Sequence, residues 1–256
     1  MFSRIGGGVI LKIRLDKLLV DRGLAPSLER AQALILAGRV LVDDQKTEKA
    51  GILIAEDVTV RLNKEEAKYV SRGGLKLEKA LAHWKIDLRE KTCLDVGAST
   101  GGFTDCLLQH GAARVIAVDT GYGQIDFRLR QDSRVRLLEK TNARYLSPDQ
   151  LAEDVDFIAM DVSFISATLV APAVIRAAFP ERPAVRQIVI LVKPQFEVNR
   201  KYVEKGGIVR NVEAQNASVE KVRNSLLALH CKETDVIESP ILGAEGNREF
   251  LLRGLF

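Results

Sequence analysis

The sequence predicts an α/β protein with a parallel sheet, preceded by a small α+β domain. From Thr92 onward, short apolar runs of strand length alternate with segments of helical periodicity, which indicates strands joined by crossover helices. Upstream, residues 14–62 combine two short helical patterns with short strands and make a separate small core. A chain of 256 residues with 46% hydrophobic residues is long enough to bury both cores.

The first 62 residues divide into a leader and the small domain. Residues 1–13 contain a run of glycines and are too short and interrupted for a secretory signal, so we expect a poorly ordered leader there. In the domain over residues 14–62, Ser27 is placed to cap a second helix over Leu28–Leu36, which Gly38 ends. The remaining predicted elements are a strand at Val40–Val42, a turn at Asp43-Asp44 and a closing strand at Asp57–Leu62.

A polar segment, residues 63–70, is predicted to link this domain to a larger one over residues 71–256. A helix over Gly74–Trp84 opens the larger domain, and alternating strands and helices follow it. The predicted strands are Thr92–Val96, Arg114–Val118, Val135–Leu138, Phe157–Met160, Gln187–Val192, Thr234–Ser239 and Phe250–Arg253. The predicted helices are Phe103–His110, Asp149–Glu153, Phe164–Phe179 and Asn211–Leu229.

A glycine-rich turn follows the first strand of the larger domain and predicts a cofactor site. Glycines at such positions permit positive φ and let the backbone approach a ligand closely, while the next helix directs unpaired N–H groups at it. The spacing Gly-x-x-x-Gly-Gly differs from the Gly-x-Gly-x-x-Gly of dinucleotide sites and fits S-adenosylmethionine better. Carboxylates that end strands suit the cationic methionyl group and the ribose hydroxyls of that cofactor. The candidate cofactor residues are Asp95, Gly97, Ser99, Gly101, Asp119 and Asn142.

Two lysines and two carboxylates occur in four short motifs of the larger domain. Lys76 lies in SRGGLKL, Asp161 in MDVSF, Lys193 in LVKP and Glu249 in EGNRE. Three of them lie where a predicted strand meets a loop, which is where open α/β sheets bind their ligands. Methyltransferases that act on base amines close the fourth strand with Asn or Asp followed by two prolines and an aromatic residue. This chain has a single carboxylate there and no proline.

Together the glycine-rich turn and the four motifs resemble the active site of FtsJ-type RNA ribose methyltransferases. The pattern Ser27-x-x-Arg30-Ala31-x-x-Leu34-Ile35-x-x-Gly38-x-Val40-x-Val42 resembles the S-four-type RNA-binding domain. The combination is similar to the TlyA or haemolysin-A-like family. This resemblance implies a Rossmann-like, seven-stranded methyltransferase sheet that uses S-adenosylmethionine. It also implies methylation of ribosomal RNA at a ribose 2′-hydroxyl, of cytidine in the characterised members of the family.

The resemblance also assigns a catalytic group and an RNA-binding group. Lys76, Asp161, Lys193 and Glu249 would surround the acceptor hydroxyl. Burial beside an apolar strand disfavours the charged form of the Lys193 amine, whereas Asp161 favours it and directs the amine. The residues alone leave open whether Lys193 is a general base or a stabilising cation. By the resemblance to the S-four-type domain, Arg30, Arg39 and Lys46 would bind RNA phosphates without reading the sequence. Arg72, beside Gly73-Gly74, is a further predicted phosphate contact.

Charge, cysteine content and the lengths of apolar runs limit the classes of function that this chain can have. The first 92 residues carry 18 Lys and Arg against 13 Asp and Glu, which suggests a polyanionic partner such as ribosomal RNA or a ribosomal subunit. Three dispersed cysteines without a Cys-x-x-Cys pair argue against zinc, so we expect no metal. The absence of an apolar run of bilayer length predicts a cytoplasmic protein without a membrane partner.

The sequence leaves two alternative functions open. The chain could be an RNA-binding or ribosome-assembly factor without turnover, or a membrane-active haemolysin. The oligomeric state is not predicted. The polar stretch beside Lys193 that contains Pro194–Glu197 and the glycine pair Gly206-Gly207 is predicted to be a mobile loop that orders on RNA binding.

Overall fold

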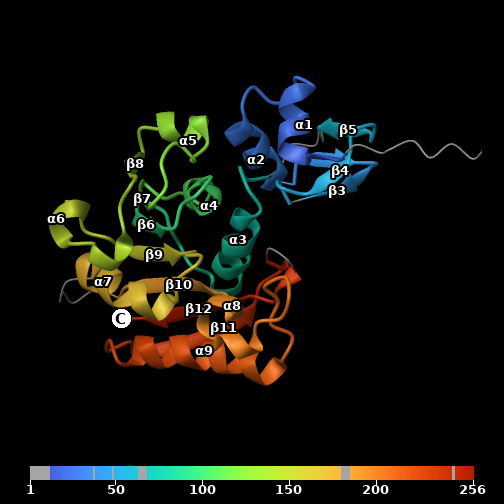
Figure 1. The fold of residues 1–256 in the computed structure, drawn as a ribbon. Coiled ribbons are helices and arrows are strands. Elements are labelled where there is room, and N and C mark those ends of the chain that lie inside the picture. Colours follow the sequence, from blue (N-terminus) through green and yellow to red (C-terminus); the bar gives the residue numbers. More distant parts are fainter. Residues whose placement is uncertain (1–11, 37, 48, 63–67, 180–184, 244–245) are drawn as a thin grey trace, which may run out of the picture. The chain divides into compact units, whose positions relative to one another are not determined.

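The computed structural model describes residues 12–256 except 37, 48, 63–67, 180–184 and 244–245. The described residues fall into two compact units that divide between Ser71 and Arg72 (Figure 1). This division lies one residue beyond the predicted start of the larger domain. The predicted fold class is confirmed: the chain has a small amino-terminal α+β unit and a larger α/β unit.

The amino-terminal unit packs two helices against short strands. Helices α1 (Leu15–Asp21) and α2 (Leu28–Leu36) contribute Leu15, Leu19, Ala31 and Ile35 to its buried core, which Val40 completes. Strands β2 (Val40–Val42), β3 (Gln45–Lys46) and β5 (Val60–Leu62) form an antiparallel sheet in the order β3-β2-β5. A separate antiparallel pair joins β1 (Lys12–Arg14) to β4 (Leu53–Ala55).

Several details of this unit differ from the prediction. Lys12 and Ile13, assigned to the poorly ordered leader, belong to β1 and pair with Ala55 and Ile54; residues 1–11 lie outside the described part of the chain. Strands β1, β3 and β4 are only two or three residues long, too short for a period-2 pattern to be recognised. In the predicted linker, residues 63–67 are not described, and the ring of Tyr69 is buried.

The turn at Asp43-Asp44 forms as predicted, and its geometry is specific. Val42 pairs with Gln45, so the turn has two residues, both with positive φ (47° and 66°). Two-residue hairpins favour this mirror-image turn, and Asp tolerates positive φ better than most residues. The hairpin therefore closes without the usual glycine.

Among the described residues, the larger unit contains one seven-stranded sheet in the order β11-β12-β10-β9-β6-β7-β8. Neighbours from β10 to β8 run parallel, whereas β12 is antiparallel to both β10 and β11. The strands are β6 (Thr92–Val96), β7 (Arg114–Val118), β8 (Val135–Leu138), β9 (Phe157–Met160), β10 (Gln187–Val192), β11 (Glu233–Glu238) and β12 (Phe250–Leu255). The first five have the predicted bounds, and the last two differ from prediction by one or two residues.

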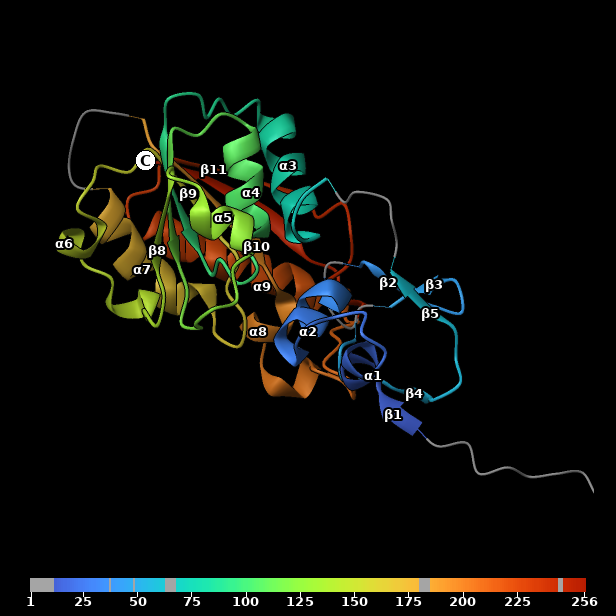
Figure 2. The ribbon, with the colours of Figure 1, turned by 90° about the horizontal axis from the view of Figure 1, so that it is seen from above.

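Helices cover both faces of this sheet. Helices α3 (Gly73–Trp84) and α4 (Gly102–Gln109) lie on one face, and α7 (Ala167–Ala178) and α9 (Val212–Leu227) lie on the other (Figures 1 and 2). The core between sheet and helices includes Ile158 and Ile190 from strands and Val174 and Val222 from helices. The short elements are α5 (Phe127–Gln131), α6 (Pro148–Leu151), α8 (Pro194–Glu197), and the 3₁₀ helices η1 (Ala143–Tyr145) and η2 (Arg200–Tyr202).

Helix α7 begins three residues later than predicted, for a local reason. Phe164 has φ of 62°, which an α-helix excludes, and Ser166 accepts a hydrogen bond from the N–H of Thr168 as the N-cap. Phe164 and the two residues between it and the helix therefore remain in the loop after β9. This loop carries Asp161 and Ser163.

The strand register brings three of the predicted catalytic residues and the glycine-rich turn to one edge. Met160 pairs with both Val96 and Ile190, so β6, β9 and β10 end at neighbouring positions. Val192 pairs with Phe250, and because β12 is antiparallel, its first residue lies at the edge where β10 ends. Gly97, Asp161, Lys193 and Glu249 follow or precede these strands directly, so all four leave the sheet at its carboxyl edge.

Candidate active site

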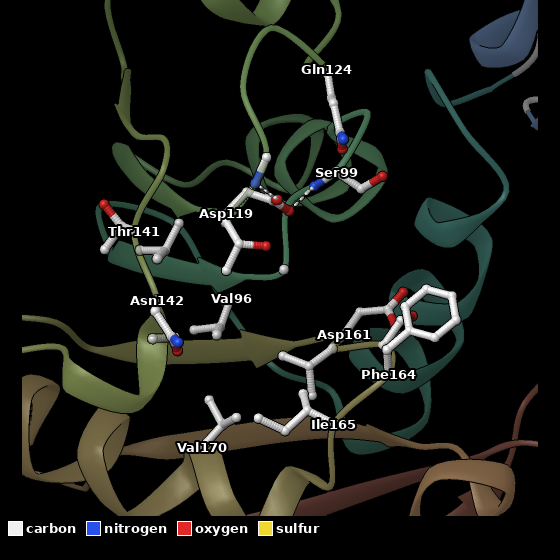
Figure 3. Close-up of a pocket in the computed structure, with 17 residues that line it drawn as sticks. Val96, Ser99, Asp119, Gln124, Thr141, Asn142, Asp161, Phe164, Ile165 and Val170 are labelled. Carbon is white, nitrogen blue, oxygen red and sulfur yellow. Dashed lines mark hydrogen bonds between the residues drawn. The ribbon is translucent and has the colours of Figure 1, made fainter.

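A pocket of about 560 Å³ opens at this edge (Figure 3). Its wall is formed by the segments that follow β6, β7, β8 and β9, together with Val170 of α7. Of the predicted cofactor residues, Gly97, Ser99, Asp119 and Asn142 line the pocket. Its size lies within the range of small-molecule sites, about 300–1,000 Å³.

Gly97 lets the turn after β6 pass close to the loop after β9. Its φ is 89°, and a Cβ at this position would lie 2.3 Å from the backbone oxygen of Asp161. The N–H of Gly97 donates to the carbonyl of Val118, and the N–H of Asp161 donates to the carbonyl of Val96. The absence of a side chain at Gly97 therefore sets the spacing between the glycine-rich turn and Asp161.

Asp119 holds the pocket wall together. Its Oδ2 accepts a 2.8 Å hydrogen bond from the N–H of Ser99, and its Oδ1 accepts a 2.6 Å bond from the N–H of Gly121 (Figure 3). Each carboxylate oxygen has a second lone pair. Asp119 can therefore accept further hydrogen bonds from a ligand while it keeps the loops in place.

Asp95 and Gly101 lie behind the pocket wall instead of lining it. The Asp95 side chain is fully buried and accepts a 2.6 Å hydrogen bond from Thr104 Oγ1. Burial raises the pKa of Asp95 to about 7, and the nearby Asp161 carboxylate adds to the increase. Gly101 has φ of 96°, and a Cβ there would lie 2.3 Å from Leu129 Cδ1. These two residues shape the turn from behind.

Asn142 lies across the pocket from Phe164, at the end formed by the segment after β8 (Figure 3). Its Oδ1 accepts a hydrogen bond of 3.1 Å from the N–H of Arg144 as the cap of η1. The side-chain amide is therefore held at the pocket wall by the turn that it caps.

Lys193 is held by two side chains from the loop after β9. Its Nζ lies 2.5 Å from Asp161 Oδ1 and donates a 2.7 Å hydrogen bond to Ser163 Oγ. Asp161 and Ser163 line the pocket, so the amine is fixed beside it. The Lys193 side chain is 12% exposed, which gives the amine limited access to solvent.

Lys76 and Glu249 form a second ion pair, which is more deeply buried. Lys76 Nζ, on α3, donates to Glu249 Oε2, and the Glu249 side chain is 2% exposed. A Cβ at Gly243 would lie 2.0 Å from Glu249 Oε1, so the glycine leaves room for the carboxylate. The structure thus joins the four predicted catalytic residues as two ion pairs, Lys193 with Asp161 and Lys76 with Glu249.

The predicted RNA contacts lie on both units. Arg30 on α2 and Lys46 on β3 are exposed, and Arg39 is partly buried directly before β2. Arg72 is partly buried and immediately precedes α3 in the larger unit. Each unit therefore presents basic side chains of its own.

Sequence reasoning did not assign some residues of the site. Gln124 and Thr141 line the pocket, and Ser163 binds Lys193. Ser163 could have been predicted as a site residue, because it lies two residues after Asp161 in the same motif. Gln124 and Thr141 lie in loops without a recognisable motif, and only the folded structure places them at the pocket.

The stretch predicted as a mobile loop beside Lys193 begins with a short helix. Pro194–Glu197 form α8, and Glu197 is 7% exposed, whereas Gly206 and Gly207 lie outside helices and strands. Proline at the first helical position and the buried carboxylate fix this helix. The polar sequence did not indicate this helix, because the partners of Glu197 lie far away in the chain. That the stretch orders on RNA binding stays a prediction.

No group of three or more potential metal ligands occurs among the described residues. Cys93, Cys106 and Cys231 are all buried. Within the part of the chain that the structure covers, no helix is long and apolar enough to cross a membrane.

Comparisons with known proteins match both units. Residues 69–256 match the family model of the FtsJ-like methyltransferases, and residues 13–68 match that of the S4 domain. The 16S/23S rRNA (cytidine-2′-O)-methyltransferase TlyA of Mycobacterium tuberculosis is 43% identical over 94% of this chain and 89% of its own length. Hemolysin A of Brachyspira hyodysenteriae is 40% identical, covering 93% of this chain and 98% of its own. A solved structure from Streptococcus thermophilus, described as a hemolysin, is 40% identical with a TM-score of 0.70, covering 96% and 89% of the two chains.

Proposed function

The chain belongs to the FtsJ-like methyltransferases that carry an amino-terminal S4 domain, and on this premise we propose that it methylates ribosomal RNA. The acceptor is a ribose 2′-hydroxyl of cytidine, and the methyl donor is S-adenosylmethionine. The relationship to TlyA supports the nucleotide and the position on it. The observation that carries the proposal is the amine of Lys193, held by Asp161 and Ser163 beside a pocket of cofactor size.

The residues around the pocket fit S-adenosylmethionine. This cofactor supplies an electrophilic methyl group on a sulfonium centre. Gly97 permits close backbone approach at one wall, and the carboxylate of Asp119 has lone pairs left for the ribose hydroxyls. Asn142 is placed to meet the adenine edge.

The four polar residues act on the acceptor hydroxyl. As the acceptor oxygen bonds to the methyl carbon, the carbon–sulfur bond would break and a neutral thioether would leave. The hydroxyl proton would pass to Lys193 acting as a base or to solvent, and negative charge develops on the oxygen where proton loss runs ahead of bond formation. Lys193, directed by Asp161 and Ser163, meets this oxygen and favours proton loss. Lys76 on α3 and Glu249 directly before β12 orient the hydroxyl. Fixed placement of such groups supplies several kcal/mol of the barrier reduction, since up to about 7–11 kcal/mol is reachable by positioning.

The substrate is recognised mainly through its backbone. Arg30, Arg39 and Lys46 of the S4 unit and Arg72 of the larger unit contact phosphates. Such contacts position the RNA, while the active site selects the acceptor. A ribosomal substrate would place the enzyme in the cytoplasm.

The test is methyl transfer to ribosomal subunits taken from cells that lack the modification. The full chain is incubated with each subunit and S-adenosylmethionine, and the RNA is digested to nucleosides for mass spectrometry. The proposal expects 2′-O-methylcytidine with the wild-type chain and none with Asp161→Asn. A methylated base, or no methylated nucleoside with either subunit, would contradict it.

The relationship to Hemolysin A keeps membrane activity as a second candidate. It predicts release of dye from liposomes by the pure chain, unaffected by Asp161→Asn. A factor that only binds ribosomal RNA predicts binding to subunits without methyl incorporation. The three functions are therefore separated by methyl transfer, dye release and subunit binding, measured on the same pair of proteins.

A further inference from the structure

We propose that Glu197 is a positioning residue for methyl transfer, because it ties together the two loops that carry Asp161 and Lys193. This inference rests on the proposed function. Glu197 does not line the pocket, and so it acts through Lys193 rather than on the substrate. Its location at the end of α8, four residues after Lys193, makes it part of the same short segment.

The Glu197 carboxylate has partners on two other helices. Its Oε1 accepts a 2.6 Å hydrogen bond from the N–H of Ala167, the first residue of α7. Its Oε2 accepts a 2.5 Å hydrogen bond from Ser166 Oγ and lies 3.0 Å from Lys221 Nζ on α9. The Glu197 side chain is 2% exposed, so the carboxylate itself is shielded from water, whereas the Lys221 side chain is 44% exposed.

These contacts connect the two halves of the catalytic ion pair. Ser166 and Ala167 end the loop after β9 that begins with Asp161, and Lys193 begins the segment that Glu197 ends. The carboxylate therefore bridges the segment after β9 and the segment after β10. A second bridge is the contact of Lys193 with Asp161 and Ser163 itself.

The buried Glu197 carboxylate requires a partner for each of its oxygens. A buried carboxylate is tolerated only when its oxygens are paired. The amino end of α7 stabilises negative charge, which adds to the hydrogen bond from Ala167. Lys221 also donates to the backbone carbonyl of Glu197, at 2.9 Å. The end of α8 is thus fixed against both α7 and α9.

Loss of this bridge should displace Lys193 while leaving the pocket intact. Misplacement of a catalytic group by about 1 Å costs about 10²-fold in rate. Cofactor affinity should stay at the wild-type value because the pocket-lining residues do not include Glu197. A residue with only a structural role would lower stability without this selective loss of kcat.

The test compares Glu197→Gln with a matched control, Asp156→Asn. Asp156 also accepts a backbone hydrogen bond between two strand segments, from Thr92 at 2.9 Å, but at the opposite edge of the sheet. For the full chain we measure kcat and KM on ribosomal subunits, the dissociation constant of S-adenosylmethionine, and Tm. Glu197→Gln is expected to lower kcat by about 10²-fold with cofactor affinity unchanged, and Asp156→Asn to keep wild-type kcat.

A second measurement follows Lys193 without relying on turnover. The rate at which a small amine-reactive reagent modifies Lys193, read by mass spectrometry, is expected to rise several-fold in Glu197→Gln and not in Asp156→Asn. Ser166→Ala removes one contact of the carboxylate together with the N-cap of α7, and should produce the same changes to a smaller degree. Wild-type kcat and wild-type Lys193 modification in Glu197→Gln would overturn the inference. Absence of methylation by the wild-type chain would instead overturn the proposed function, and the modification rates would still decide the role of Glu197.

Discussion

Replacement of Gly97 by alanine tests how the glycine-rich turn and the catalytic loop are joined. The added Cβ would lie 2.3 Å from the backbone oxygen of Asp161 and 2.9 Å from its carbonyl carbon. Backbone atoms cannot turn aside as the end of a flexible side chain can. Either the turn after β6 or the loop after β9 must therefore move, and Asp161 with it.

The expected loss of stability has two parts. An L-residue with the φ of 89° found at Gly97 costs about 1–2 kcal/mol. Overpacking against a fixed neighbour costs a further 1–3 kcal/mol, roughly. Gly97→Ala should therefore lower the free energy of unfolding by about 2–5 kcal/mol.

Gly123 supplies the matched control. It lies in the next loop of the same edge, with φ of 71°, and a Cβ there would meet nothing within 4 Å. Gly123→Ala should cost only the backbone part, about 1–2 kcal/mol. Urea unfolding gives both stabilities, and calorimetric titration gives the affinity for S-adenosylmethionine, which should fall only in Gly97→Ala. Equal stability losses and unchanged cofactor affinity in the two variants would refute the reasoning.

Three further predictions concern the charged groups. Lys193→Ala should abolish methyl transfer while cofactor binding stays close to wild type, with the exposed Lys232→Ala as control; loss of both functions together would count against the assigned role. Lys76→Met should lower the free energy of unfolding by about 3–5 kcal/mol because it leaves Glu249 buried and unpaired. The double variant Lys76→Met with Glu249→Gln should recover much of this loss in urea unfolding, and a larger loss in the double variant would be inconsistent with the ion pair. Asp95→Asn tests the raised pKa of about 7. Between about pH 4 and pH 7 the folded state keeps a proton that the unfolded state has lost, so wild-type stability falls as pH rises, by up to about 1.4 kcal/mol per pH unit from this group. Asn resembles the protonated carboxyl, so the stability advantage of Asp95→Asn should grow between about pH 5 and pH 8; an equal difference at both values would contradict the assignment.

The larger unit could be predicted well because its signals are local and strong. Five strands have the predicted bounds, since each is a mainly apolar run that a polar residue or glycine follows directly. Asp161 and Lys193 could be located because each directly follows such a run. The alternation of strands and helices then implied that these positions meet at one edge of a sheet.

The remaining details depend on contacts that sequence periodicity does not contain. The late start of α7 follows from the positive φ of Phe164, which nothing in an apolar helical pattern indicates. The ordered helix α8 depends on the partners of Glu197, which are between 24 and 31 residues away in the chain. Asp95 was expected to meet the cofactor, yet it lies behind the turn because Thr104, on the next helix, binds it there. The residues next to Asp95 on the strand do not indicate this hydrogen bond.

The central claim is that Lys193, Asp161, Lys76 and Glu249 surround a ribose hydroxyl beside the methyl donor. The most direct measurement is an experimental structure of the full chain with a non-reactive cofactor analogue and its ribosomal substrate. We expect the 2′-oxygen of the target nucleotide within hydrogen-bond distance of Lys193 Nζ, about 2.7–3.2 Å, with the analogue in the pocket lined by Gly97 and Asp119. A base nitrogen at that position, or a target ribose turned away from Lys193, would contradict it.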